Sequence, residues 1–124
     1  MASLQTYQVE AKEIEPERKV VQIEVVYTQE RIIEKIREAF PEQPDLMVKI
    51  AKCEGIKNGK LDPTVISPTN DHGLFQINQA AHGKRLKELG IDPLTVEGNL
   101  QYARMLYDES GTQPWYMSKP CWNK

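Results

Sequence analysis

The pattern of apolar and polar positions becomes helical after Thr28. From there, apolar residues recur at the spacing of one helix face until Pro41 stops the run; they are Ile32, Ile33, Ile36, Ala39 and Phe40. Thr28 is of a residue type that caps helix N-termini. We therefore predict a first helix of about twelve residues.

Three further helices are predicted from the same kind of pattern. The second begins at Asp45, which is expected to cap it, and ends at Gly55 after the run "MVKIAKCE". The third covers "QAAHGKRLKEL" and ends at Gly90, and the fourth extends from Thr95 to Gly111. The apolar stripe of the fourth helix consists of Leu100, Ala103, Leu106 and Tyr107.

The remaining segments are polar, extended or irregular. Residues 1–19 are rich in Glu and Lys, which favours a tail or linker, and "VVQIEVVYT" (20–28) suits a short strand or an extended arm. A long stretch rich in Gly, Pro, Asn and Asp precedes "GLFQIN". The prediction is a mainly α (α+β) fold: a helical domain over residues 28–124, with a small β-hairpin or loop flap that forms a cleft, preceded by a tail, linker or extended arm over 1–27.

Composition narrows the possible partners. The chain has 124 residues, a net charge of -2 and 27% charged residues, so no basic excess favours nucleic acid. No apolar run approaches the roughly 18 residues of a membrane helix, and the first residues lack the apolar core of a signal peptide. His72 and His82 have no Cys or carboxylate cluster at metal spacing. We expect a monomer that uses no metal and no cofactor.

Glu54 is the first candidate for chemistry. It ends the most apolar helix, directly after "MVKIAKC", where burial disfavours the charged form of a carboxyl. The partial negative charge of a helix C-terminus acts in the same direction. Both effects are expected to raise the pKa of Glu54, which suits a general acid.

Asp71 is the second candidate and lies 17 positions later, in "SPTNDHGLFQIN". A neutral carboxyl at a helix end that faces an ionised carboxylate on a polar turn is the arrangement of glycoside hydrolysis. The neutral group protonates the leaving oxygen, and the ionised one stabilises an oxocarbenium ion or forms a covalent intermediate. His72, beside Asp71, is expected to cap the turn.

Four stretches together resemble the lysozyme-like superfamily of c-type lysozymes and bacterial lytic transglycosylases. They are "IAKCEG", "TNDHGLFQIN", "GNLQYARMLY" and "GTQPWYMSKPCW", and they cover roughly residues 44–122. The resemblance implies Glu54 as general acid and Asp71 as stabiliser or nucleophile. It also implies that Gln76 and Asn78 contact acetamido sugars, with Ile77 turned into the core. Trp115 would supply apolar surface near Glu54 or a sugar face.

The function implied is cleavage of the β-1,4 bond between N-acetylmuramic acid and N-acetylglucosamine, with peptidoglycan glycan strands as partner. Hydrolysis is favoured because of Asp71; a lytic transglycosylase that forms 1,6-anhydro ends needs Glu54 alone. A non-catalytic glycan-binding or assembly module of the same fold is the other alternative. It stays open because both families usually have Ser after the catalytic Glu, and this chain has Gly55.

The cysteines bear on localisation. From spacing alone, Cys53 and Cys121 are equally compatible with two buried thiols and with one disulfide. An enzyme that acts on cell walls works in an oxidising place, so we predict the Cys53–Cys121 disulfide and an extracytoplasmic protein: secreted, periplasmic or at the cell surface. Residues 1–27 would then suit a spacer from a membrane tether.

Overall fold

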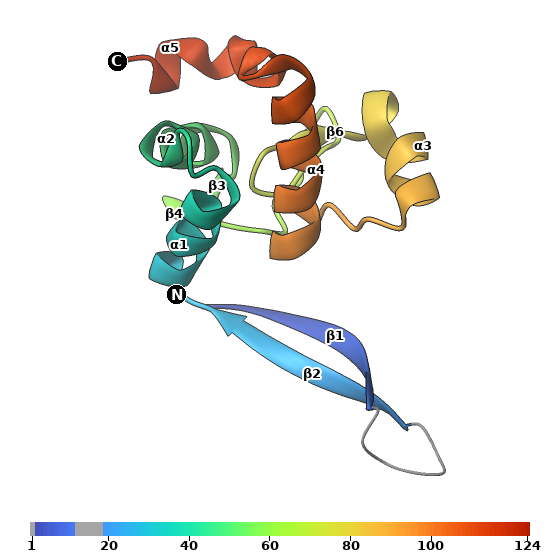
Figure 1. Ribbon diagram of the computed structural model, residues 1–124. Coiled ribbons are helices and arrows are strands. Elements are labelled where there is room, and N and C mark those ends of the chain that lie inside the picture. Colours follow the sequence, from blue (N-terminus) through green and yellow to red (C-terminus); the bar gives the residue numbers. More distant parts are fainter. Residues whose placement is uncertain (1, 12–18) are drawn as a thin grey trace.

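The computed structural model describes residues 2–11 and 19–124, and its elements form a helical body with an extended arm (Figure 1). The helices are α1 (Gln29–Ala39), α2 (Pro44–Glu54), α3 (Gln79–Leu89), α4 (Val96–Ser110), the 3-10 helix η1 (Gln113–Ser118) and α5 (Lys119–Trp122). The strands are β1 (Ser3–Ala11), β2 (Lys19–Tyr27), β3 (Ile56–Lys57), β4 (Lys60–Leu61), β5 (Asp71–His72) and β6 (Ile77–Asn78). The mainly α, α+β character expected from the sequence is confirmed.

The helix ends follow the capping residues of the sequence, with one exception. Thr28 accepts a 3.1 Å hydrogen bond from the Arg31 N–H, and Gly90 ends α3 in the left-handed conformation (φ 67°). Asp45 was expected to cap α2, and this is wrong. Pro44, whose fixed φ suits a first helical position, is the first residue of the helix, so the N-cap is Gln43, two residues before Asp45.

Two small antiparallel hairpins fill the segment between α2 and α3. Strand β3 pairs with β4, and β5 pairs with β6 in the register Asp71↔Asn78 and His72↔Ile77. The β insertion expected between the second and third helices is therefore present. It consists of two hairpins, each with two residues per strand.

The arm is a third hairpin, in which β1 and β2 pair antiparallel from Ser3↔Tyr27 to Ala11↔Lys19. It extends away from the helices (Figure 1). The strand expected within residues 20–28 is confirmed, and Ser3–Ala11, for which a tail or linker was expected, is the second strand of the same arm. The pairing partner lies 8 to 24 positions away in the sequence, so a local pattern in β1 gave no sign of it.

The base of the arm is attached to the body. Tyr27 is 3% exposed, and its hydroxyl donates to the Glu97 carboxylate on α4. The Gln5 side chain donates to the Leu94 carbonyl at 3.1 Å and accepts from the Val96 N–H at 3.0 Å. These contacts connect the base of the arm to the loop before α4 and to α4 itself.

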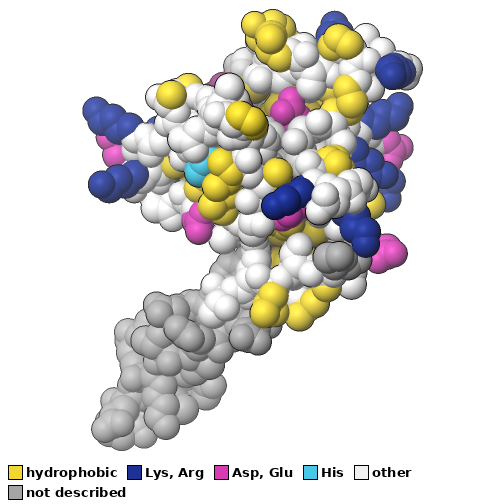
Figure 2. Space-filling model, turned by 180° about the vertical axis from the view of Figure 1, so that it is seen from behind, with side chains coloured by type: hydrophobic (Ala, Val, Ile, Leu, Met, Phe, Trp, Pro, Cys, Tyr) yellow, Lys and Arg dark blue, Asp and Glu magenta, His cyan; other side chains and the backbone are white. Residues whose placement is uncertain are grey.

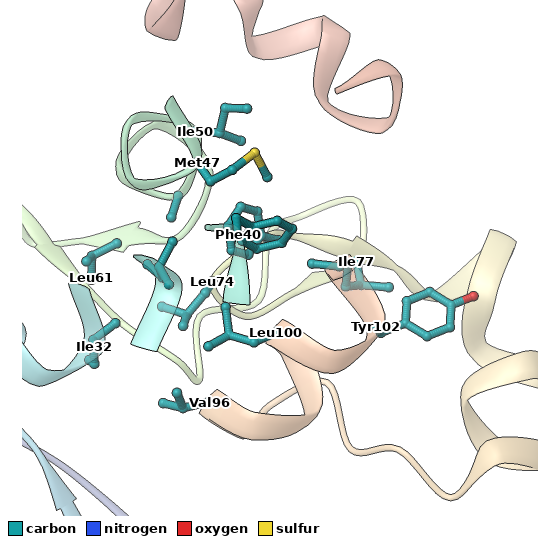
Figure 3. Packing of buried hydrophobic residues seen from close by; sticks show 14 of the residues in the cluster. Ile32, Phe40, Met47, Ile50, Leu61, Leu74, Ile77, Val96, Leu100 and Tyr102 are labelled. Atoms are coloured by element: carbon teal, nitrogen blue, oxygen red, sulfur yellow. The ribbon is translucent and has the colours of Figure 1, made fainter. Parts of the chain in front are cut away.

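The core lies where α1, α2 and α4 meet the loop between β5 and β6. Phe40, Met47, Leu74 and Leu100 are among the side chains that converge there (Figure 3). Cys53 at the end of α2 and Cys121 in α5 form a disulfide with a Cα–Cα distance of 6.1 Å, as predicted. This bond joins the helix that carries Glu54 to the C-terminal segment.

Candidate active site

Glu54 is the last residue of α2, and its backbone is closely packed on the loop before β6. Ile50 and Ala51, in the preceding turn, are fully buried. Gly55 closes the helix with a 2.7 Å hydrogen bond from its N–H to the Ala51 carbonyl. A Cβ on Gly55 would lie 2.4 Å from the Leu74 carbonyl oxygen, so glycine is required there by close approach and not by its φ of -97°.

The turn between β5 and β6, on which Gly55 packs, is held in place by Asn99, a fully buried polar residue of α4. Its side chain accepts from the Phe75 N–H and donates to the carbonyls of His72 and Pro93, each at 2.8 Å. Gly73 has a φ of +76°, and a Cβ there would lie 2.5 Å from the Asn99 amide nitrogen. The "DHGLF" turn therefore has a single position relative to the helical body.

Asp71 is the centre of a polar cluster on this turn. Its Oδ2 accepts hydrogen bonds from the Ser67 hydroxyl at 2.7 Å and from the Thr69 hydroxyl, and its Oδ1 accepts from Asn78 Nδ2 at 2.8 Å. Both carboxylate oxygens are thus engaged by donors. The conformation of Asp71 is fixed before any ligand binds.

Glu54 and Asp71 line one pocket of about 350 Å³. The rest of its lining comes from the turn, α3, α4 and η1: Thr69, Phe75, Gln76, Ile77, Asn78, His82, Leu106, Pro114, Trp115 and Met117. A second hollow of about 370 Å³ lies beside the β3–β4 hairpin and the base of the arm. Asp62 is the single carboxyl residue among the described residues that line this hollow, so no carboxyl pair faces across it. The Asp62 carboxylate accepts hydrogen bonds from the Thr64 hydroxyl at 2.8 Å and from the Thr64 N–H at 2.9 Å.

The two carboxyls of the first pocket are shifted in opposite directions. Burial raises the pKa of Glu54, and the negative charge of Asp71 adds to this rise, against a hydrogen bond from Ser118 that lowers it. Partial burial acts upward on Asp71 as well, but the hydrogen bonds from Thr69, Ser67 and Asn78 outweigh it and lower the pKa of Asp71. One group therefore tends to keep its proton and the other to lose it, which suits an acid and an anionic stabiliser.

Gln76 and Asn78 both line the pocket with Glu54, but their amides differ in availability. The Asn78 side chain caps α3 through the Ala81 N–H (2.9 Å) and holds Asp71, so both of its ends serve the protein. The Gln76 Nε2 donates to the Gly73 carbonyl at 3.0 Å. Within the described part of the chain its Oε1 accepts no hydrogen bond. This oxygen is the acceptor that remains for a ligand N–H.

Trp115 lines the same pocket as Glu54, but its indole is not an open platform. It is 3% exposed, packs edge-on against Phe75 at 5.4 Å between ring centroids, and donates from Nε1 to the Phe75 carbonyl at 2.9 Å. Stacking of a sugar face on this ring is therefore not supported. The exposed apolar side chains next to it in the sequence are Tyr116 (57%) and Met117 (77%). Figure 2 shows yellow side chains at the upper end of the molecule and also elsewhere on the same face.

Two residues of the site were missed from the sequence. His82 stands one helical turn after Asn78, a spacing that placed it on the pocket side of α3, and its Nδ1 is 2.8 Å from the hydroxyl of buried Tyr102. The Ser118 hydroxyl, in η1, acts to lower the pKa of Glu54, and nothing in its local sequence indicated this. His72 was expected to cap the turn, and its Nε2 lies 2.7 Å from Asn70 Oδ1 there.

The site has no metal-binding geometry in the described ranges, because no three His, Cys, Asp or Glu side chains come together there. Among the helices of residues 19–124, none has the length and apolar character required to cross a membrane. The disulfide indicates folding in an oxidising, extracytoplasmic environment.

Comparisons of the chain with protein-family models, with curated proteins and with solved structures each return no match.

Proposed function

We propose that this protein is a peptidoglycan-cleaving glycosidase with a lysozyme-like fold, acting outside the cytoplasm on the β-1,4 bond between N-acetylmuramic acid and N-acetylglucosamine. The observation that carries the proposal is the pair Glu54 and Asp71, which line one pocket with pKa values shifted in opposite directions. The choice of peptidoglycan as the polymer is supported by the four stretches that resemble the lysozyme-like superfamily.

In the proposed reaction, protonated Glu54 donates its proton to the glycosidic oxygen as the bond from C1 of the muramyl ring to that oxygen breaks. The positive charge that develops on the ring is stabilised by the Asp71 carboxylate. A water molecule then attacks C1 and gives its proton to the Glu54 carboxylate, which restores the acid. Gln76 Oε1 is available to accept a hydrogen bond from an acetamido N–H.

Lytic transglycosylation is the second candidate, because it requires no carboxylate nucleophile. Ser67, Thr69 and Asn78 occupy both Asp71 oxygens, which suits a fixed charge better than a nucleophile. In this route the C6 hydroxyl of the muramyl ring attacks C1, and Glu54 takes the hydroxyl proton. No water is consumed and a 1,6-anhydro end forms.

The test is clearing of a peptidoglycan suspension by wild type, Glu54→Gln, Asp71→Asn and the exposed control Glu88→Gln on α3. We expect Glu54→Gln to lose at least about a hundredfold in rate and Glu88→Gln to match wild type. Mass spectrometry of the released fragments separates the routes, since hydrolysis leaves reducing ends and transglycosylation leaves anhydro ends.

If Glu54→Gln is inactive, Asp71→Asn stays active and the released fragments carry anhydro ends, the protein is a lytic transglycosylase and not a hydrolase. Absence of clearing by wild type, with retained glycan binding, would identify a non-catalytic glycan-binding module. Equal clearing by wild type and Glu54→Gln would refute the site assignment.

A further inference from the structure

A further hollow, of about 340 Å³, adjoins the last turn of α2 and is basic. The described residues that line this basic hollow are Lys49, Lys52, Cys53, Cys121, Trp122 and Lys124. Its charged side chains are thus three lysines, and none of its lining residues belongs to the lining of the Glu54 pocket. The basic hollow is therefore separate from the candidate active site.

The walls of the basic hollow come from the two ends of the helical body that the disulfide joins. Lys49, Lys52 and Cys53 lie on one side of α2, because positions three and four residues apart share a helix face. The other wall comes from α5, which lies beside α2 (Figure 1), and from Lys124 after it. Cys53 and Cys121 both line the hollow, so the bond between them fixes its two walls relative to each other.

The three lysines have no acidic partner among the described residues. The sequence contains no Asp or Glu in residues 46–53 or 111–124, and the ion pairs within the described ranges are all made by arginines. The α-carboxylate of Lys124, the last residue of the sequence, balances one of the three charges. Two positive charges remain, in a chain whose overall net charge is -2.

Helix stability accounts for only one of these lysines. Lys52 is in the last turn of α2, where the partial negative charge of the helix end favours a cation. Lys49 lies before that turn, three positions from Lys52, and two like charges at this spacing repel each other. An anion bound in the hollow would remove the repulsion. The charge pattern therefore fits an anionic ligand better than it fits a purely structural role.

The size and the place of the hollow indicate what kind of anion fits. A single hollow with two excess charges suits a ligand that presents one or two anionic groups, whereas a long polyanion requires a row of cations. Cys53 lines this hollow and Glu54 lines the active-site pocket, and the Cα atoms of consecutive residues are about 3.8 Å apart. An anionic group carried by the glycan strand in the pocket is thus well placed to enter the basic hollow.

We propose that the basic hollow binds a carboxylate of the peptide stems that peptidoglycan carries on its muramyl residues. The ammonium groups of Lys49 and Lys52 would bind this carboxylate as point charges, with Lys124 on the opposite wall. The identity of the ligand rests on the proposed function, whereas the unpaired charge of the hollow does not. These lysines are binding residues, and they take no part in breaking the glycosidic bond.

The experiment is an NMR titration of the nitrogen-15-labelled, oxidised full chain with N-acetylmuramyl pentapeptide, a probe that contains no glycosidic bond to cleave. We expect the backbone amide signals of Lys49, Lys52 and Lys124 to shift with this probe. They should not shift with the same compound after its carboxylates are converted to amides. Because salt screens charges at the surface, the affinity should fall as the ionic strength rises.

Two pairs of substitutions remove the same charge at the same helical spacing. Lys49→Gln/Lys52→Gln is expected to weaken binding of the charged probe roughly three- to tenfold. The matched control is Lys84→Gln/Lys87→Gln on α3, two exposed lysines that are also three positions apart, and it should bind like wild type. Lys49→Arg/Lys52→Arg keeps the charge and should retain binding. Lys49 and Lys52 are exposed, so these variants are expected to fold as wild type does.

Equal affinity for the charged and the amidated probe, or an equal loss of affinity in the two glutamine variants, overturns the inference. Inorganic phosphate is the third probe. If it shifts the same amides at lower concentrations than the muramyl peptide does, the hollow is a phosphate site and the carboxylate assignment is wrong. A wild type that binds the charged probe but clears no peptidoglycan refutes the proposed cleavage and leaves this binding site in place. Clearing by a wild type that does not bind the probe has the opposite meaning.

Discussion

The side-chain oxygen of Asn99 accepts a 2.8 Å hydrogen bond from the backbone N–H of Phe75, and this contact ties the turn that carries Asp71 to α4. The amide nitrogen of Asn99 completes the connection through two carbonyls of the surrounding loops, those of His72 and Pro93. One buried side chain thus bonds three backbone groups, two of which, the Phe75 N–H and the Pro93 carbonyl, lie outside the strands and helices.

Replacement of Asn99 by alanine should be among the costliest changes in the protein. It leaves the Phe75 N–H without its partner and removes the side-chain donor of the His72 and Pro93 carbonyls, and we expect a loss of about 3 kcal/mol in the free energy of unfolding. Chemical denaturation measures it, with the exposed C-terminal Asn123→Ala as control, expected within about 0.5 kcal/mol of wild type. Equal stabilities of the two variants would contradict this role of Asn99.

Glu54 should cost stability at neutral pH. Its folded pKa is raised above the ordinary value of 4.5, so the fold favours the protonated form. Its contribution to stability is complete below the unfolded pKa and is lost as the pH rises through the folded pKa. Glu54→Gln should therefore melt at the same temperature as wild type near pH 4 and a few degrees higher at pH 7.

Thermal melts of both proteins across this range, with Glu88→Gln as the surface control, measure the difference. A Tm difference that does not change with pH would show that Glu54 is not held in a raised-pKa environment. This result is independent of any activity.

Asn78 joins two functions that substitution can separate. Serine at this position keeps a good N-cap for α3 but cannot reach Asp71 as the amide does, whereas alanine loses both contacts. We expect the pKa of Asp71 to rise in both variants, and Asn78→Ala to be about 1 kcal/mol less stable than Asn78→Ser. NMR titration measures the pKa of Asp71, and denaturant melts measure the free energy of unfolding. An Asp71 pKa that is unchanged in both variants would mean that the hydrogen bonds from Ser67 and Thr69 alone lower it.

The depressed pKa of Asp71 also has a consequence for acid stability. Its ionised form stabilises the fold above the unfolded pKa, and this contribution is lost as the pH falls through the folded pKa. Asp71→Asn should therefore reduce the free energy of unfolding at pH 7 and have less effect at strongly acidic pH, as urea melts at the two pH values can show.

The disulfide should carry a large share of the stability. Cys53 and Cys121 are 68 positions apart, and closing a loop of that length in the unfolded chain corresponds to about 4 kcal/mol. The double variant Cys53→Ser/Cys121→Ser should lose approximately this amount, and reduced wild type should show the same loss. A reductant that destabilises the double variant to a similar extent would mean that the effect does not come from the bond.

The four longer helices, α1 to α4, were predictable because residues within and next to each helix determine where it begins and ends. Thr28, Gly90 and Thr95 mark their ends through their own side chains or backbone freedom, and the apolar spacing between these residues predicts the buried faces. Strand β1 was not predictable, since its nine residues depend on pairing with a strand elsewhere in the chain. The helical structure of the aromatic C-terminal segment was missed as well, because η1 and α5 are short and packed through Trp115 and Trp122.

The candidate site shows the same division. Glu54 was recognised from its place at the end of an apolar helix, and Asp71 from its polar turn. Ser118 and Asn99 act across 64 and 24 positions of sequence, on the Glu54 carboxyl and on the Phe75 backbone respectively. Contacts of this kind become visible only when the packing of α2, α4 and η1 on one another is known.

The Cys53–Cys121 bond also affects when, after synthesis, the cleft becomes ordered. A newly made chain in a reducing cytoplasm lacks this bond, so its acid-bearing helix and the Ser118 segment are held only by noncovalent contacts. Under the proposed function, the cleft would reach its full order only after the chain meets an oxidising environment. That is also the side of the membrane on which peptidoglycan lies, so maturation of the enzyme and access to its substrate would coincide.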